Sequence, residues 1–180
     1  MWFLPREEGA ASIRADPQAF ISSFARRIET GLLGDRSSRR CRYLVTRQGS
    51  EGLAFRATDW MTAIAVGLNN VELAVSSDRR VRYTIRYLRW ARYALLGCGA
   101  FGLVFGAFLL MFDIRGYIEQ HAASRVPGLS LETNIAIVWT MVFFWGFVWP
   151  WILIALHKKP LGRLMERLIA EVEAVSMKGT

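Results

Sequence analysis

Residues that form covalent bridges or bind metals are scarce in this chain. It has two cysteines and two histidines among 180 residues. Cys98 lies inside a long uncharged run and Cys41 lies outside it, so we expect no disulfide and a reducing compartment around Cys41. His121 and His157 lie on opposite sides of a second uncharged run, so we expect no shared metal ion. The pattern predicts neither a metal site nor a cofactor.

Charged residues are missing altogether from these two runs. Tyr93–Phe112 is twenty residues without a charge, and Ile135–Leu156 is twenty-two. Because a helix rises about 1.5 Å per residue, each run is long enough to cross a hydrocarbon core of about 30 Å. Uncharged runs of this length are typical of membrane spans rather than of buried core helices. We therefore predict transmembrane helices at 93–112 and 135–156.

A cleavable signal sequence is also missing from the pattern. The apolar cluster before Pro5 has only three residues, and acidic residues follow where basic ones would be needed. We expect the first transmembrane helix to direct insertion, and residues 1–15 to be a flexible leader.

Positive charge is distributed unequally around the two runs. Six arginines precede the first run, four basic residues follow the second, and the connecting residues 113–134 contain only Arg115 and Arg125. The six are Arg79, Arg80, Arg82, Arg86, Arg89 and Arg92. This asymmetry predicts that both termini are cytoplasmic and that residues 113–134 form an extracytoplasmic loop. Twenty arginines against three lysines suggest a GC-rich genome, and hence a bacterial inner membrane.

Residues 16–90 are expected to form a small cytoplasmic α+β domain. Asp16-Pro17 is typical of a helix start, and an apolar stripe continues every four residues toward Gly34. The stripe consists of Phe20, Phe24, Ile28 and Leu32.

Alternating apolar residues then predict two β-hairpins. The first joins Arg42–Arg47 to Leu53–Thr58, and the second joins Val71–Val75 to Val81–Tyr87. Residues 59–68 fit either a short helix capped by an aspartate or a strand, and we favour the helix.

Residues 157–180 are predicted to be a cytoplasmic amphipathic helix and tail, with the helix opening at Pro160. Two placements remain open for it. In the first, the helix lies flat on the inner leaflet; in the second, it docks on the soluble domain or on another helix.

Small residues recur every four positions along the first transmembrane helix. They are Ala94, Cys98, Gly102 and Gly106. This pattern lets helix backbones approach closely, so we expect it to pack either against the second span or against another subunit or partner helix. Within the second span we expect Trp145 to pack against these glycines and Pro150 to kink the helix.

The six arginines alternate with tyrosines and a tryptophan next to the first span. Juxtamembrane arginines are attracted to anionic lipids by about 1 kcal/mol each, and aromatic rings favour the same interface. We therefore predict that these six arginines bind anionic lipid at the cytoplasmic leaflet. Nucleic-acid binding and internal ion pairs are the weaker alternatives.

Catalytic motifs are absent, including nucleophile elbows, zinc-protease signatures and phosphate loops. Glu119 and His121 could do acid–base work together, but a solvated loop helix explains them better. The spans also lack the ionisable residues of ion-coupled transporters. We therefore expect that this protein is not an enzyme.

The predicted fold is a membrane α-helical hairpin of two transmembrane helices with a small N-terminal cytoplasmic α+β domain and a C-terminal amphipathic helix. The function predicted is that of a non-catalytic membrane protein that anchors, recruits or regulates a partner complex at the cytoplasmic membrane face. Its first span is expected to bind a protein partner or to self-associate. The alternative is a homo-oligomeric pore or membrane-disrupting effector gated by the cytoplasmic domain.

Overall fold

The computed structural model describes residues 4–32, 42–121 and 125–177. The chain divides into two compact units. One unit joins Met1–Ala91 to Ala155–Thr180, and the other is Arg92–Ile154. Cys41 and Gly34 lie outside the described residues.

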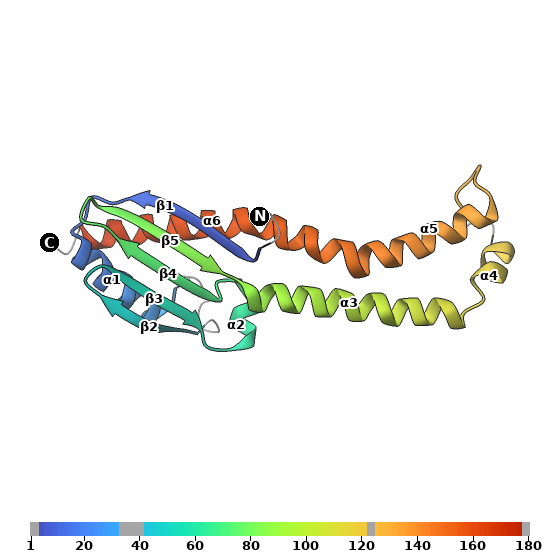
Figure 1. Ribbon diagram of the computed structural model, residues 1–180, viewed down its shortest axis with the longest axis horizontal. Coiled ribbons are helices and arrows are strands. Elements are labelled where there is room, and N and C mark those ends of the chain that lie inside the picture. Colours follow the sequence, from blue (N-terminus) through green and yellow to red (C-terminus); the bar gives the residue numbers. More distant parts are fainter. Residues whose placement is uncertain (1–3, 33–41, 122–124, 178–180) are drawn as a thin grey trace. The chain divides into compact units, whose positions relative to one another are not determined.

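The first unit is built on a five-stranded antiparallel sheet with the order β1-β5-β4-β3-β2 (Figure 1). Its strands are β1 (Arg6–Ser12), β2 (Tyr43–Gly49), β3 (Gly52–Ala57), β4 (Asn70–Val75) and β5 (Arg80–Arg86). Both expected hairpins, β2–β3 and β4–β5, are present. The sheet positions the polar residues discussed below.

The N-terminal segment is not the flexible leader that we expect from the sequence. Residues Arg6–Ser12 form strand β1, which pairs with β5 along its whole length. Gly9 allows this pairing, because a Cβ atom there would lie 2.2 Å from the Tyr83 hydroxyl oxygen. The inward-facing residues of β1 are small or charged, so the strand lacks the apolar alternation that marks the other four.

One face of the sheet is covered by α1 (Pro17–Thr30) and by the C-terminal part of α6 (Trp149–Ser176), which both lie behind the sheet in Figure 1. Asp16 caps α1 by accepting hydrogen bonds from the backbone N–H groups of Gln18 and Ala19 at 3.0 and 3.1 Å. The helix ends at Thr30 and is followed by Gly31 with φ 118°, so it is shorter than the sequence stripe suggests. Large buried side chains of the core include Phe20, Phe24, Phe55, Leu53, Ile85 and Met165.

Residues 59–68 contain a helix, α2 (Trp60–Ala65), as favoured from the sequence. The Asp59 carboxylate accepts a hydrogen bond from the Thr62 backbone N–H at 2.7 Å. This bond, which stabilises the charged form, is the main cause that lowers the pKa of Asp59 below its ordinary value. Gly67 then turns the chain with φ 81°.

The C-terminal helix does not begin at Pro160. Helix α6 runs without interruption over Trp149–Ser176, with Pro160 inside it. Proline there removes the hydrogen bond to the Leu156 carbonyl, but Leu156 and Pro160 are both exposed, so that carbonyl is not sealed in the core. Of the two placements considered, α6 takes the one on the domain. The apolar side chains that its C-terminal part buries are Leu161, Met165, Leu168, Ile169 and Val172.

The second unit contains most of α3 (Leu88–Met111), the short helix α4 (Ile114–Gln120), and α5 (Leu131–Phe143). A π-helical turn, η3 (Phe144–Val148), joins α5 to α6. It ends just before Pro150, where an α-helical turn would bring the proline ring against the Gly146 carbonyl. Two stretches, Leu88–Met111 and Leu131–Ser176, are long and apolar enough to cross a membrane.

Candidate functional site

Two hydrogen bonds fix the first turn of α3 to the sheet domain. One uses a side chain of the helix, and the other uses a side chain of the domain. The Arg89 guanidinium donates to the Ala57 carbonyl at 3.1 Å, and the Trp90 backbone N–H donates to the buried Asn69 amide oxygen at 2.9 Å. Asn69 in turn donates to the Ala63 carbonyl at 2.9 Å. Arg89, expected to bind lipid, therefore also holds the helix start in place.

His157 lies in an aromatic cluster of the same unit. Its ring stacks on Trp90 with centroids 4.0 Å apart and lies 5.6 Å from the ring of Tyr87. Gly67 faces the histidine, since a Cβ atom there would lie 2.2 Å from His157 Nε2. Burial lowers the pKa of His157 below its ordinary 6.5. Burial, with a smaller contribution from Glu7, raises the pKa of Tyr87 to about 12, so both rings are neutral near pH 7.

The six arginines predicted to bind lipid do not form one cluster. Arg80, Arg82 and Arg86 alternate along β5 and are exposed on the sheet face opposite the helices. Arg79 lies in the β4–β5 turn with φ 60°. Arg89 is on the first turn of α3, and Arg92 is exposed on the same helix.

Two of the β5 arginines form exposed ion pairs. Arg80 lies 3.4 Å from Asp78, and Arg86 lies 3.6 Å from Glu72. Pairs this exposed contribute about 0–1 kcal/mol, so these arginines remain available to other anions.

The small residues of α3 have different surroundings. A Cβ atom at Gly102 would lie 2.8 Å from the Gly146 Cα atom, which makes this the close crossing of the hairpin. Gly106 has nothing within 4 Å of such an atom. Cys98 and Ala94 are half-buried. The stripe thus supplies an internal helix contact at Gly102 and an open position at Gly106.

A groove of about 470 Å³ lies beside this crossing, within the second unit. It is lined by Gly97, Cys98 and Phe101 of α3, and by Trp145 and Trp149. Trp145 therefore borders α3 near Gly97, while Gly146 and Phe147 make the contact with Gly102. The lining is mostly apolar, and Cys98 is its one ionisable side chain.

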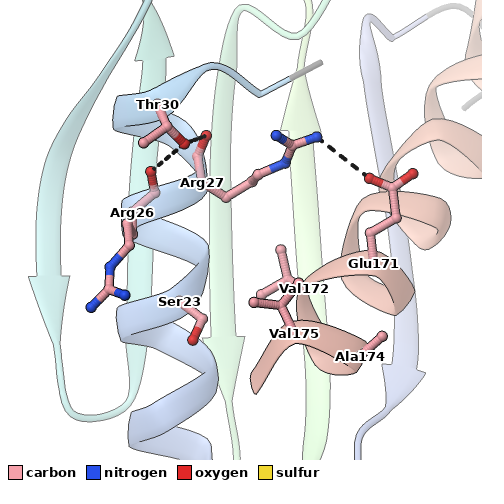
Figure 2. A pocket seen from close by; sticks show the side chains of 8 residues that line it. All are labelled: Ser23, Arg26, Arg27, Thr30, Glu171, Val172, Ala174 and Val175. Carbon is pink, nitrogen blue, oxygen red and sulfur yellow. Dashed lines mark hydrogen bonds and ion pairs between the residues drawn. The ribbon is translucent and has the colours of Figure 1, made fainter. Parts of the chain in front are cut away.

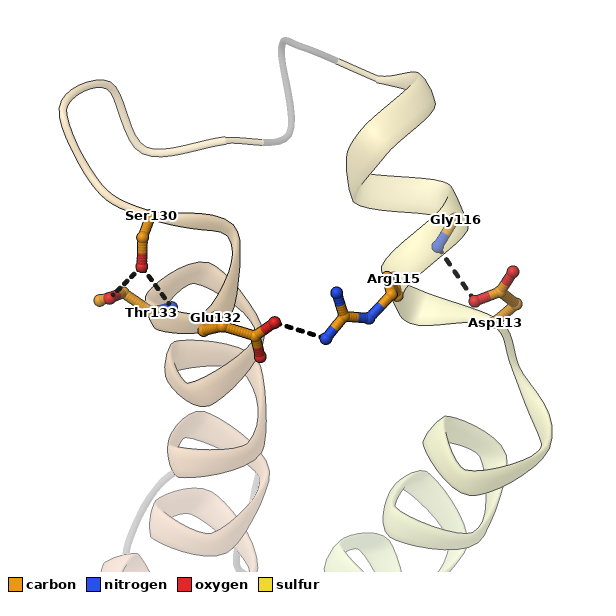
Figure 3. Close-up of polar contacts among 6 residues, drawn as sticks. All are labelled: Asp113, Arg115, Gly116, Ser130, Glu132 and Thr133. Carbon is orange, nitrogen blue, oxygen red and sulfur yellow. Dashed lines mark hydrogen bonds and ion pairs between the residues drawn. The ribbon is translucent and has the colours of Figure 1, made fainter.

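The polar end of the second unit is held by capping contacts (Figure 3). Asp113 caps α4 through the Gly116 N–H at 3.0 Å, and Ser130 caps α5 through the Thr133 N–H at 3.2 Å. Arg115 forms an ion pair with Glu132.

Arg125 is engaged as well. It donates to the backbone carbonyls of Ile118 and Glu119 at 2.9 and 2.8 Å. Both arginines of the region expected to be extracytoplasmic therefore form contacts within that region.

A second groove, of about 480 Å³, lies between α1 and the end of α6 (Figure 2). Arg26 and Arg27 lie on the α1 side, and Val172 and Val175 on the α6 side. Arg27 reaches across to Glu171 at 3.7 Å, so one guanidinium is already paired with an acid.

No set of three or more histidine, cysteine or acidic residues in the described part of the chain could hold a metal ion. His121 stacks on Tyr117 at 4.4 Å, with its Nδ1 atom 2.9 Å from the Tyr117 carbonyl.

Comparisons with protein-family models, curated proteins and solved structures find no match to this chain.

Sequence reasoning missed three further arginines on the exposed sheet face, Arg6, Arg47 and Arg56. They lie on β1, β2 and β3, far apart in the sequence, and only the strand register brings them onto the face that carries the β5 arginines. The available signal was the alternation of basic and apolar residues within β3 and β5.

Proposed function

We propose that this chain is a two-span membrane protein that recruits or regulates a protein partner at the cytoplasmic face of a bacterial inner membrane, without catalysis. Its hairpin anchors a small domain, and the domain presents the binding surface. Anionic lipid at the inner leaflet contributes through the arginines around the start of α3.

The observation that carries this proposal is the exposure of the two apolar helices. In the most apolar stretch of α3, only 6% is buried inside the protein. In the most apolar stretch of Leu131–Ser176, the buried share is only 17%. Leu103, Leu110 and Met111 are 66%, 79% and 88% exposed. A helix that served as a soluble core would bury such side chains, at about 1.5–3 kcal/mol each. A bilayer is the environment that accommodates them.

The division into units supports two crossings. Residues before Arg92 and residues after Ile154 belong to the same compact unit. Both flanks of the hairpin must therefore lie on one side of a membrane, which requires an even number of crossings. A hairpin of two spans meets this requirement.

Charge supports a cytoplasmic placement of that unit. Basic residues flank the hairpin on the domain side, whereas Arg115 and Arg125 in the connecting region are engaged by an acid and by backbone carbonyls. By the positive-inside rule, this asymmetry favours the cytoplasmic side for the domain.

The test is accessibility of single cysteines to a membrane-impermeant maleimide in intact cells. With Cys41→Ser and Cys98→Ala as the background, Gln120→Cys should be labelled from outside, and Ser22→Cys only after the cells are opened. Both positions are exposed in the structure. The reverse pattern would overturn the orientation, and equal labelling of both would overturn the membrane hairpin.

Purification in mild detergent then separates the anchor from a pore. A co-purifying protein bound to the domain supports the anchor. A homo-oligomeric ring that conducts ions in reconstituted bilayers supports the pore instead.

A further inference from the structure

The sheet of the first unit has one face that no described helix covers. Figure 1 shows this face toward the viewer, with α1 and α6 behind the strands. Side chains directly across an antiparallel ladder share a face, so the register identifies its members without ambiguity. Arg82, for example, pairs with Ala10 on β1 and with Ala74 on β4, and all three residues are exposed.

Arginine dominates the charge of this open face. Its basic residues are Arg6, Arg47, Arg56, Arg80, Arg82 and Arg86. The acidic residues at described face positions are Glu8 and Glu72, so the face carries a net charge of +4 (six arginines minus two glutamates). The glutamates are already engaged, because Glu8 pairs with Arg6 and Glu72 lies 3.6 Å from Arg86.

Arg56 and Arg82 form no ion pair within the described part of the chain. Arg56 is exposed between Leu44 and Asn70, and small neighbours leave Arg82 accessible. Arg82 stands in a row of Ala10, Ala74, Gly52 and Gly49 that crosses all five strands. With strands about 4.8 Å apart, this row is about 19 Å long from the first strand to the last.

From this arrangement we infer that the open face binds an acidic segment of a partner protein, with Arg56 and Arg82 as its principal contacts. All six cations are arginines, whose planar guanidinium groups bind carboxylates in a two-pronged geometry. The row of small side chains lets a polypeptide backbone approach the sheet closely. This inference names the surface and the partner chemistry for the function proposed above, and so rests on it.

Two other polyanions fit the face less well. The described residues of this face include no aromatic ring, and single-stranded nucleic acid is held largely by stacking on such rings. Glu8 and Glu72 also interrupt the positive charge, whereas a lipid surface attracts a uniformly basic patch. A carboxylate-bearing chain, which can place its charges between these glutamates, is the better complement.

The experiment titrates a labelled polyglutamate peptide against the full chain in neutral phosphatidylcholine nanodiscs. The test variant is R56Q/R82Q. The control is R26Q/R163Q, which removes the same charge from exposed positions on α1 and α6, the helices on the other side of the sheet. We expect R56Q/R82Q to weaken peptide binding about three- to tenfold relative to the control, the size expected of two exposed ion pairs. The difference should shrink as salt is raised.

Equal losses in the two variants would overturn the inference, because binding would then follow net charge rather than this face. So would a loss confined to phosphatidylglycerol vesicles or to an RNA oligomer, measured in parallel. Both variants should still pass the cysteine-labelling test of the hairpin. Failure of that test alone removes the membrane anchor and leaves the peptide result standing.

Discussion

At the scale of single residues, His157 makes the domain sensitive to pH. The folded protein holds its ring neutral between Trp90, Tyr87 and Gly67, with a pKa below the ordinary 6.5. Unfolding releases the ring to water. Between the lowered pKa and 6.5 the unfolded chain binds a proton that the folded chain does not bind. Lowering the pH through this range therefore lowers the stability of the folded protein.

We therefore expect the wild-type protein to lose thermal stability as the pH falls below about 6.5, where an unperturbed histidine becomes charged. Stability is full above pH 6.5 and falls until the pH passes the lowered pKa of His157. His157→Phe keeps an aromatic ring against Trp90 and has no proton to gain, so its melting temperature should depend less on pH. Nε2 forms no hydrogen bond with the described residues, so the replacement loses none.

The matched control is His121→Phe, which removes an exposed histidine. Its pH dependence should match that of the wild type. If His157→Phe and the wild type changed equally, His157 would be no more buried in solution than His121.

At the scale of elements, the two glycines one helical turn apart on α3 allow intramolecular packing to be separated from association. Gly102 touches Gly146, and Gly106 has open space around it. Isoleucine at 102 should therefore destabilise the hairpin by about 1–3 kcal/mol, the usual cost of overfilling a tight contact. Isoleucine at 106 should leave thermal stability unchanged.

Thermal melts and oligomeric mass in mild detergent give the readout. If α3 also joins subunits, Gly106→Ile should lower the mass while Gly102→Ile lowers the melting temperature. Destabilisation by Gly106→Ile but not by Gly102→Ile would contradict the helix crossing described above.

Most elements could be predicted because their signals are local. The hairpins follow from alternation, α1 and α2 from aspartate caps, and the two long apolar helices from their missing charges. Strand β1 could not be predicted. Glycine is needed at position 9 to make room for the Tyr83 side chain, which lies on a strand far away in the sequence. Helix α6 was divided wrongly at Pro160 because a proline signal is local, whereas the packing of Leu161 and Met165 that keeps the helix continuous is not.

At the scale of the whole molecule, the domain is assembled from both ends of the chain. From the sequence, residues 16–90 are expected to make a domain of their own, barely large enough for a core. In the structure, α6 brings a large part of that core from residues 155–180. The amphipathic pattern of residues 157–180 left this closure as one of two open placements. It could not decide between them, because the closure depends on contacts between residues nearly the length of the chain apart. The open arginine face was hidden for the same reason.

This closure predicts that residues 1–91 do not fold alone. Without α6 the sheet loses five buried apolar side chains, at about 1.5–3 kcal/mol each, or about 8–15 kcal/mol in all. That equals the whole stability of a typical domain, about 5–15 kcal/mol.

Residues 1–91 joined to 155–180 by a flexible glycine–serine linker should instead give a cooperatively unfolding soluble domain. Circular dichroism melts of the two chains make the comparison. A matched third chain, with Met165→Asp in the linked protein, should behave like residues 1–91, because Met165 is fully buried against the core. A cooperative melt from residues 1–91 alone would mean that α6 only rests on a finished domain, and the two ends of the chain would then no longer be required on the same side of a membrane.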